Sequence, residues 1–264
     1  DDGATAPESY RPHTTVGVFV PTVLPAVPQW ATRKPWLIGS ASRFRPDAPP
    51  PVTSDLWARD LNEVKALGGK NSKLRDAEQT EIARFWEFSL PAIYHGLLRS
   101  VARPPERDVL ANARLFAVTS QAMDDALISV MDAKYHYNFW RPVTAVRNAD
   151  IDGHDGTERE PAWTPLIDTP THPEYPCAHC ILAATVGTLL KVEMASVPGL
   201  VLSTSSPTAK GATRRWNTPE AMMQEVADAR IYDGVHYRNS TEVGLDMGRR
   251  IGELAASRLK PTAN

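Results

Sequence analysis

The chain has 264 residues and a formal net charge of −2. This length suffices for one well-buried domain or two small ones. The nearly balanced charge gives no support for binding to nucleic acid or to a membrane surface, and no apolar run approaches the ~18 residues that make a membrane span a candidate. The first residues, DDGATAPESYRP, contain neither an initiator Met nor an apolar signal region, so we expect a processed or truncated form. A periplasmic or secreted location is favoured over the cytoplasm.

Residues 1–53 are rich in proline, which makes regular helix improbable there. The prolines are Pro7, Pro12, Pro21, Pro25, Pro28, Pro35, Pro46, Pro49, Pro50 and Pro51. We expect this segment to be an ordered loop that wraps a helical domain of residues 54–264. Trp30 and Trp36 are its expected anchors.

The rest of the chain carries helix signals. Ser54 is a candidate N-cap, and Gly68-Gly69 would end the helix that it starts. Thr218 followed by Pro219 predicts another helix start. The helices are expected at about 54–67, 76–101 with a kink at Pro91, 106–133, 178–192, 219–232 and 240–259. No run alternates with period 2 for long enough to predict a sheet, so we expect an all-α helical bundle.

Two adjacent carboxylates, Asp124 and Asp125, lie inside the expected helix 106–133. Adjacent residues point ~100° apart on a helix. A capping or salt-bridge role is therefore favoured over a metal pair.

Three short segments together carry the groups that bind a tetrahedral oxyanion. They are KYHYNFWRP with Lys134, Arg141 and Pro142, YPCAHC with Pro176, Cys177, Ala178 and His179, and ARIYDGVHY with Arg230 and His236. A phosphate-like group away from bulk water needs several charge-assisted hydrogen bonds, which two arginines and one lysine supply. Two histidines leave one to bond the central atom and one to move protons.

Each residue also has a plain structural explanation. Lys134 alone is typical of a solvated helix end, Arg141 of an ion pair with Asp150 or Asp155, and Arg230 of another helix terminus. His236 alone is typical of a buried structural histidine, and His13, His95 and His154 match no motif. The joint order and spacing favour the oxyanion site over these separate explanations.

The spacing resembles that of the vanadium-dependent haloperoxidases and the related type 2 phosphatidic acid phosphatases. In this chain six residues separate Lys134 from Arg141, and five separate Arg230 from His236. The resemblance extends from about Val52 to Lys260, and the strings NFWRPVTAVR and HPEYPCAHC resemble the bacterial haloperoxidase-like branch.

The chain departs from the family pattern at four positions. Cys177 replaces a serine, Ala178 a glycine, Ala229 a serine, and Ser240 an aspartate. Cys177 is a weaker donor to an oxyanion than serine. Ser240 holds His236 less strongly than a carboxylate would.

The resemblance implies vanadate as the cofactor, with hydrogen peroxide and a halide as partners. His236 would bind the metal, and Lys134, Arg141, Arg230, Cys177 and the backbone at Ala178 would hold its oxygens. His179 would take a proton from hydrogen peroxide, and Lys134 would polarise it. The alternatives are an acid phosphatase that acts on small phosphoesters through a phosphohistidine, and an oxyanion-binding homologue without turnover. The sequence leaves open whether the protein forms an oligomer.

His172 lies seven positions before His179. The resemblance implies bromide or iodide rather than chloride, because the algal bromoperoxidases carry histidine there and the fungal chloroperoxidases phenylalanine. The plain alternative is a hydrogen bond within the Pro-rich turn. The resemblance also implies that Ser240 contacts His236 rather than the oxyanion itself.

Cys177 and Cys180 permit other interpretations. With His172 and Glu174 they resemble a zinc deaminase motif, but only Tyr175 separates its two halves. They also resemble a thioredoxin-type pair, without the surrounding βαβ pattern. At a helix start beside cations, we expect Cys177 to be a thiolate that peroxide oxidises and Cys180 resolves into a disulfide.

Overall fold

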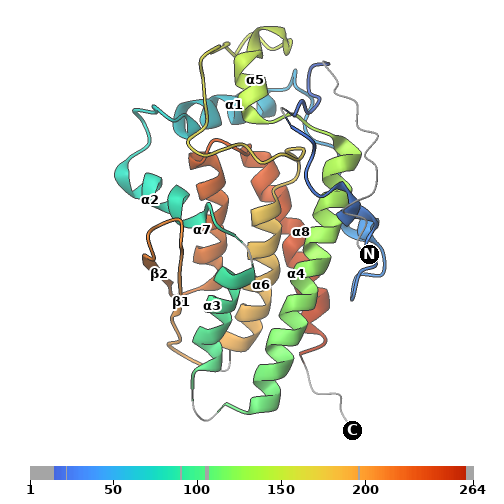
Figure 1. Ribbon diagram of the computed structural model, residues 1–264, viewed down its shortest axis with the longest axis vertical. Helices are drawn as coiled ribbons and strands as arrows, with labels where there is room; N and C mark the ends of the chain where they lie inside the picture. The colour runs from blue at the N-terminus through green and yellow to red at the C-terminus, as the bar shows by residue number, and fades with distance from the viewer. Residues whose placement is uncertain (1–14, 22, 90, 105–106, 196, 260–264) are drawn as a thin grey trace.

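The computed structural model describes residues 15–259 except residues 22, 90, 105, 106 and 196. It is mainly helical, which confirms the expected fold class (Figure 1). The described elements are η1 (Pro28–Thr32), η2 (Ala41–Phe44), α1 (Asp55–Gly68), α2 (Ala77–Trp86), α3 (Pro91–Ala102), α4 (Val109–Tyr137), α5 (Pro142–Arg147), η3 (Ala149–Ile151), α6 (Ala178–Met194), β1 (Leu202–Ser205), β2 (Thr213–Trp216), α7 (Pro219–Tyr232) and α8 (Arg238–Ala256).

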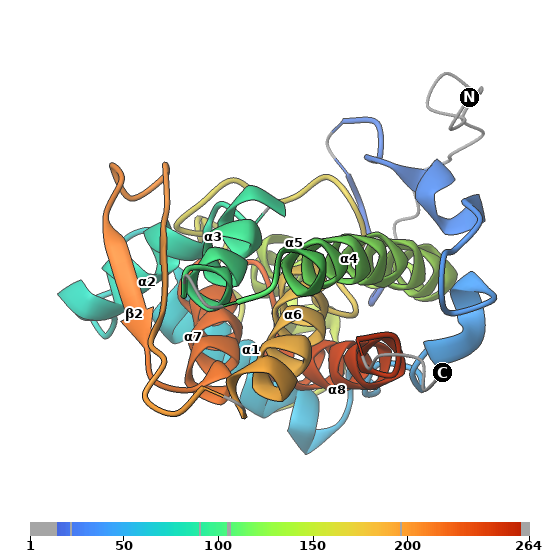
Figure 2. The ribbon, with the colours of Figure 1, turned by 90° about the horizontal axis from the view of Figure 1, so that it is seen from below.

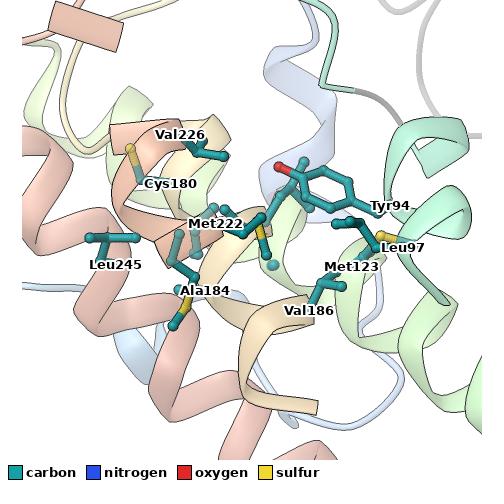
Figure 3. Close-up of a cluster of buried hydrophobic side chains, with 14 of the residues drawn as sticks. Tyr94, Leu97, Met123, Cys180, Ala184, Val186, Met222, Val226 and Leu245 are labelled. Carbon is teal, nitrogen blue, oxygen red and sulfur yellow. The ribbon is translucent and has the colours of Figure 1, made fainter. Parts of the chain in front are cut away.

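Helix α6 is the centre of the bundle. Seen from below, it lies among α4, α7 and α8 (Figure 2). Its sequence is apolar on nearly every side, and most of its residues are buried. A helix that is hydrophobic all round packs inside a larger core. Figure 3 shows Cys180 and Ala184 of α6 in this core with Met222 of α7 and Leu245 of α8.

The contact between α6 and α8 depends on a row of glycines. Gly244, Gly248 and Gly252 are four residues apart, so they share one face of α8. A Cβ atom at Gly248 would lie 2.3 Å from the carbonyl oxygen of Ile181 on α6. Only a residue without a side chain permits this approach of the two backbones.

Local capping explains where several helices begin. The Ser54 side chain accepts a hydrogen bond from the Trp57 N–H, and Thr218 accepts one from Ala221. These starts were predicted from the sequence and are confirmed. The expected start at Glu106 lies outside the described residues, and the structure describes α4 from Val109.

The prediction of a single kinked helix over 76–101 is wrong. The structure has two helices, because α2 ends at Trp86 and α3 begins at Pro91. Proline lacks the N–H that continues a helix and disfavours helical geometry in the preceding residue. Pro91 therefore starts a new helix rather than kinking one.

Three short elements, β1, β2 and α5, were not predicted. Strands β1 and β2 pair antiparallel, with Leu202 opposite Trp216. Each has only four residues, which is too short for a clear alternating pattern. Helix α5 follows Arg141, and its first residue is Pro142, a position that proline favours.

The N-terminal segment lies against α4 through η1 and η2 (Figure 1). Asp125 is buried, and its carboxylate accepts hydrogen bonds from the N–H groups of Trp36, Leu37 and Ile38. Asp124 binds Arg33 and the Trp36 indole, although the Trp36 ring is 62% exposed. The structural role expected for the two aspartates is confirmed.

Pro7, Pro12 and His13 lie outside the described residues. Among the described helices, none is long and apolar enough to cross a membrane.

Candidate functional site

The predicted site residues lie at one end of the bundle, where α4 and α7 end and α5, α6 and α8 begin (Figure 1). Lys134 is in the last turn of α4, and Arg141 precedes α5. His179 is in the first turn of α6, Arg230 in the last turn of α7, and His236 in the turn before α8. The fold thus brings together residues that are far apart in the sequence.

Two backbone positions shape this end. Asn138 ends α4 with a φ of 50°, a left-handed conformation that asparagine tolerates. Gly234 has a φ of 80°, and a Cβ atom there would lie 2.3 Å from the carbonyl oxygen of Gly68. The turn that carries His236 therefore requires glycine.

Lys134 and Arg141 bind the segment that precedes α6. The Lys134 ammonium donates to the carbonyl oxygens of Pro173 at 2.9 Å and Glu174 at 2.6 Å. The Arg141 guanidinium donates through Nε to the His172 carbonyl at 2.9 Å and through Nη1 to the Val235 carbonyl at 2.8 Å. Both side chains are at most 1% exposed, so the solvated role for Lys134 does not apply. Asp150 pairs with Arg159 instead of Arg141.

Arg230 forms an ion pair with a buried acid, Asp233. Its Nη1 lies 2.5 Å from the Asp233 carboxylate and donates to the Trp86 carbonyl at 3.2 Å. Its Nε is buried without a hydrogen-bond partner within the described protein. Burial raises the pKa of Asp233 to about 7, against the opposing charge of Arg230.

The buried cations shift one another's pKa. Burial, then the charge of Arg141, lowers the pKa of Lys134 well below its usual value. Burial lowers the pKa of Arg141 to about 10, with Glu174 opposing the shift. Positive charge concentrated away from water favours an anionic ligand.

His236 and His179 are under the same influence. Burial, followed by Arg141 and Lys134, lowers the pKa of His236 well below its ordinary value. Burial and then Arg230 do the same for His179. His179 Nε2 is buried and has no hydrogen-bond partner within the described protein. Both shifts favour the neutral imidazole.

The Nδ1 atom of His236 lies 2.6 Å from Glu174 Oε1. The same oxygen accepts the Tyr237 N–H at 3.2 Å, whereas Ser240 Oγ is 3.5 Å from Nδ1. Burial raises the pKa of Glu174 to about 7. Sequence reasoning missed this contact. The available signal was an acidic residue in the otherwise apolar HPEYP string, which a buried ion partner would explain.

Cys177 is in the disulfide form that oxidation of the expected thiolate would produce. It caps α6, and a disulfide joins it to Cys180. A disulfide sulfur has no S–H to donate, so the expected role of Cys177 toward an oxyanion requires the reduced pair. Neither cysteine is free to bind zinc in this form, and no group of three or more metal-binding side chains occurs in the part of the chain that the structure describes. Ala178 begins α6, where the first N–H groups lack intrahelical partners.

His172 contacts the site through Arg141, whose Nη2 lies 3.0 Å from His172 Nδ1. Its pKa is well below the ordinary value because of burial and then the charges of Lys134 and Arg141. A cleft of about 290 Å³ lies beside Arg141, between Phe19–Pro21 and residues 168–171. His95 and His154 instead bind Ser120 and Asp55, respectively.

The donors fit a tetrahedral oxyanion such as vanadate. Three buried cations act electrostatically on His236. Two buried nitrogens, Arg230 Nε and His179 Nε2, are unpartnered within the described protein. The N-terminus of α6 adds positive potential and N–H donors. The roles of the individual residues stay predictions.

Residues 114–264 match a family model described as the VCPO second helical-bundle domain. The chain therefore belongs to this family of the vanadium haloperoxidases, and the resemblance noted in the sequence is confirmed. Vanadium chloroperoxidase from Curvularia inaequalis is 29% identical over 150 residues, which are 46% of this chain and 24% of that protein.

The solved structures agree on the fold. A bacterial vanadium-dependent iodoperoxidase superposes with a TM-score of 0.78 at 26% identity, over 96% of this chain and 63% of its own. A holo-type bacterial vanadium-dependent chloroperoxidase has a TM-score of 0.68 at 20% identity, over 92% of this chain and 55% of its own. The chain spans less than two-thirds of these relatives' length.

Proposed function

We propose that this chain is a vanadate-dependent haloperoxidase that oxidises halide with hydrogen peroxide. The observation that carries the proposal is the set of buried cations: Lys134, Arg141 and Arg230 are each at most 1% exposed, and the charge of each lowers the pKa of buried His236. The buried acids Asp233 and Glu174 offset part of this charge. The positive charge that they leave favours an anionic ligand. Membership in the VCPO helical-bundle family supports the same ligand.

Vanadate, when bound, would supply a Lewis-acid centre that activates hydrogen peroxide without a change of oxidation state. Lys134, Arg141 and Arg230 would neutralise the charge on the oxyanion. His236 would hold the metal through Nε2, the ring nitrogen that lies 3.4 Å from Arg141 Nη1. The N–H groups at the start of α6 would complete the anion site.

His179 is the proposed proton acceptor. Its lowered pKa keeps the imidazole neutral, so Nε2 can accept a proton from hydrogen peroxide and return it later. Its place in the first turn of α6 fixes the ring beside Arg230. The Nε2 atom itself is buried.

Bromide or iodide is the proposed halide. His172 lies against Arg141, which lines the cleft between Phe19–Pro21 and residues 168–171. The similarity to the bacterial iodoperoxidase, at 26% identity and across 96% of this chain, supports iodide in particular.

The test loads metal-free protein with vanadate and measures oxidation of iodide, bromide and chloride by hydrogen peroxide, beside hydrolysis of a phosphomonoester. We expect vanadate-dependent oxidation of iodide and bromide. Lys134→Met should abolish it, whereas Lys191→Met, which changes an exposed lysine of α6, should not. Phosphomonoester hydrolysis without halide oxidation would replace the proposal by a phosphatase. Vanadate binding without either reaction would indicate a homologue that has lost turnover.

A further inference from the structure

The two ring nitrogens of His236 face opposite chemical partners. Nε2 lies 3.4 Å from Arg141 Nη1, and Nδ1 lies 2.6 Å from Glu174 Oε1. A guanidinium has only donors, so Nε2 must present its lone pair toward Arg141. The proton of the neutral ring then belongs on Nδ1, where Glu174 accepts it.

Glu174 is itself held in place. Glu174 is 0% exposed. Its Oε1 accepts a hydrogen bond from the Tyr237 N–H at 3.2 Å, and its backbone carbonyl accepts one from the Lys134 ammonium. Its own N–H donates to the Phe139 carbonyl at 2.9 Å. The carboxylate therefore belongs to the ordered segment that leads into α6, and it cannot turn away without losing its bond to Tyr237.

Ser240 does not hold the ring as Glu174 does. Its Oγ lies 3.5 Å from His236 Nδ1, at the limit of a hydrogen bond. Glu174 is nearer by almost an ångström and offers a carboxylate. A histidine that binds a metal commonly donates its other N–H to such a group, which fixes its tautomer and raises its basicity.

We propose that Glu174 is the positioning residue of the oxyanion site, which holds His236 with Nδ1 protonated and Nε2 free for the ligand. Glu174 supplies from the loop before α6 the carboxylate that Ser240 on α8 does not provide. The inference rests on the proposed role of His236 as the residue that bonds the oxyanion. Glu174 acts through His236 and does not touch the ligand itself.

The first measurement is the tautomer of His236, by long-range ¹H–¹⁵N correlation NMR of ¹⁵N-histidine-labelled, ligand-free protein, with His236→Gln to assign its signals. Wild type should show the Nδ1–H form. Glu174→Ala should lose this preference. Glu174→Gln should keep the Nδ1–H form, because the amide oxygen still accepts a hydrogen bond from Nδ1–H. This variant also provides a test if Glu174→Ala does not fold.

The second measurement is the affinity for vanadate and for inorganic phosphate by calorimetry. Glu174→Ala should weaken both by about 10–100-fold, the usual effect of removing such a partner. Adding Ser240→Asp to Glu174→Ala should recover most of the loss. The new aspartate would place a carboxylate next to His236 Nδ1, where Ser240 Oγ now lies at 3.5 Å. Glu242→Ala, which removes an exposed carboxylate two residues from Ser240, is the control and should leave affinity unchanged.

The outcomes separate this inference from the proposed function. If folded Glu174→Ala keeps both the Nδ1–H tautomer and wild-type affinity, Glu174 does not position His236. If the tautomer and affinity change as expected but the wild type oxidises no halide, the positioning role stands and the haloperoxidase assignment fails. If the wild type oxidises halide but Glu174→Ala keeps the wild-type tautomer, the haloperoxidase assignment stands and the positioning role fails.

Discussion

Single residues at the site combine binding and structural tasks. Lys134 and Arg141 each donate to two backbone carbonyls, which offsets part of the cost of burying their charge. These bonds also tie the segment before α6 to the turn before α8. The cations are consequently fixed before a ligand arrives, so an oxyanion meets preorganised positive charge.

The two histidines should respond differently to mutation. His236→Ala should abolish both vanadate binding and peroxidase turnover, because it removes the proposed bond to the metal. His179→Ala should leave binding largely intact and slow turnover by roughly 10²–10⁴, the usual contribution of a positioned acid–base group. Calorimetry with vanadate and a halide-oxidation assay check both variants. Equal loss of binding in the two would contradict the assignment.

His172 should make the stability of the ligand-free protein depend on pH. Its folded pKa is lowered, so below the unfolded value of about 6.5 the unfolded chain takes up a proton that the folded protein does not. The stability contribution of His172 is thus present above about pH 6.5 and is lost as the pH falls below it.

His172→Asn removes this effect. The free energy of unfolding of the variant relative to wild type should therefore rise as the pH falls from 7.5 to 5.5, by up to about 1.4 kcal/mol, the equivalent of one pKa unit. Urea denaturation at the two pH values measures it, and His95→Asn serves as a comparison at a less buried site. A pH-independent difference for His172→Asn would show that this ring protonates freely in the folded state.

Among the elements, the pair of α6 and α8 fixes the geometry of the site. The glycines of α8 let its backbone approach α6 closely, and a Cβ atom at Gly244 would lie 2.7 Å from the Cys177 carbonyl oxygen. His179 and His236 stand at the N-terminal ends of this pair. Any separation of the two helices would move one histidine relative to the other.

Gly248→Ala tests this packing. Alanine improves helix propensity by up to ~1 kcal/mol, but its methyl group would clash with Ile181 and Ala184. Overpacking of this kind costs about 1–3 kcal/mol or more, so we expect a net loss of stability and weaker vanadate binding. Arg249→Ala, at the next and exposed position, is the control for urea denaturation. A variant at Gly248 as stable as wild type would show that the helices can separate freely.

At the scale of the whole molecule, the N-terminal segment is fastened to the bundle by side chains of α4. The contacts join residues about 90 positions apart, because Asp125 binds the backbone of residues 36–38. Part of the same segment, Phe19–Pro21, forms one wall of the cleft beside Arg141. The segment therefore contributes both to stability and to the shape of the cleft beside Arg141.

Adjacent aspartates provide a matched comparison for this attachment. Asp125→Ala leaves three backbone N–H groups without their buried acceptor and should cost about 3 kcal/mol of stability. Asp124→Ala removes a partly exposed pair with Arg33 and should cost about 1 kcal/mol at most. Hydrogen exchange should show faster exchange of the amides of residues 36–38 only in Asp125→Ala. Similar losses in the two variants would argue against this account.

The sequence by itself determined two of the helix starts and the family. Ser54 and Thr218 cap the helices that follow them, and the three spaced motifs indicated the family on their own. These signals are local: a cap satisfies backbone N–H groups three residues away, and a motif reflects chemistry that a family retains. The same local reasoning failed at Pro91, where a kink and a new helix have nearly the same sequence signature.

Only the tertiary structure decided which buried groups are partners. Glu174 contacts His236 across 62 positions, and Asp125 contacts Trp36 across 89. A carboxylate in the sequence has many candidate partners, and the choice among them depends on which helices pack together and how closely. The glycines of α8 set that distance for α6. Packing of the whole chain therefore fixed the orientation of His236, because its two ring nitrogens face residues from separate segments.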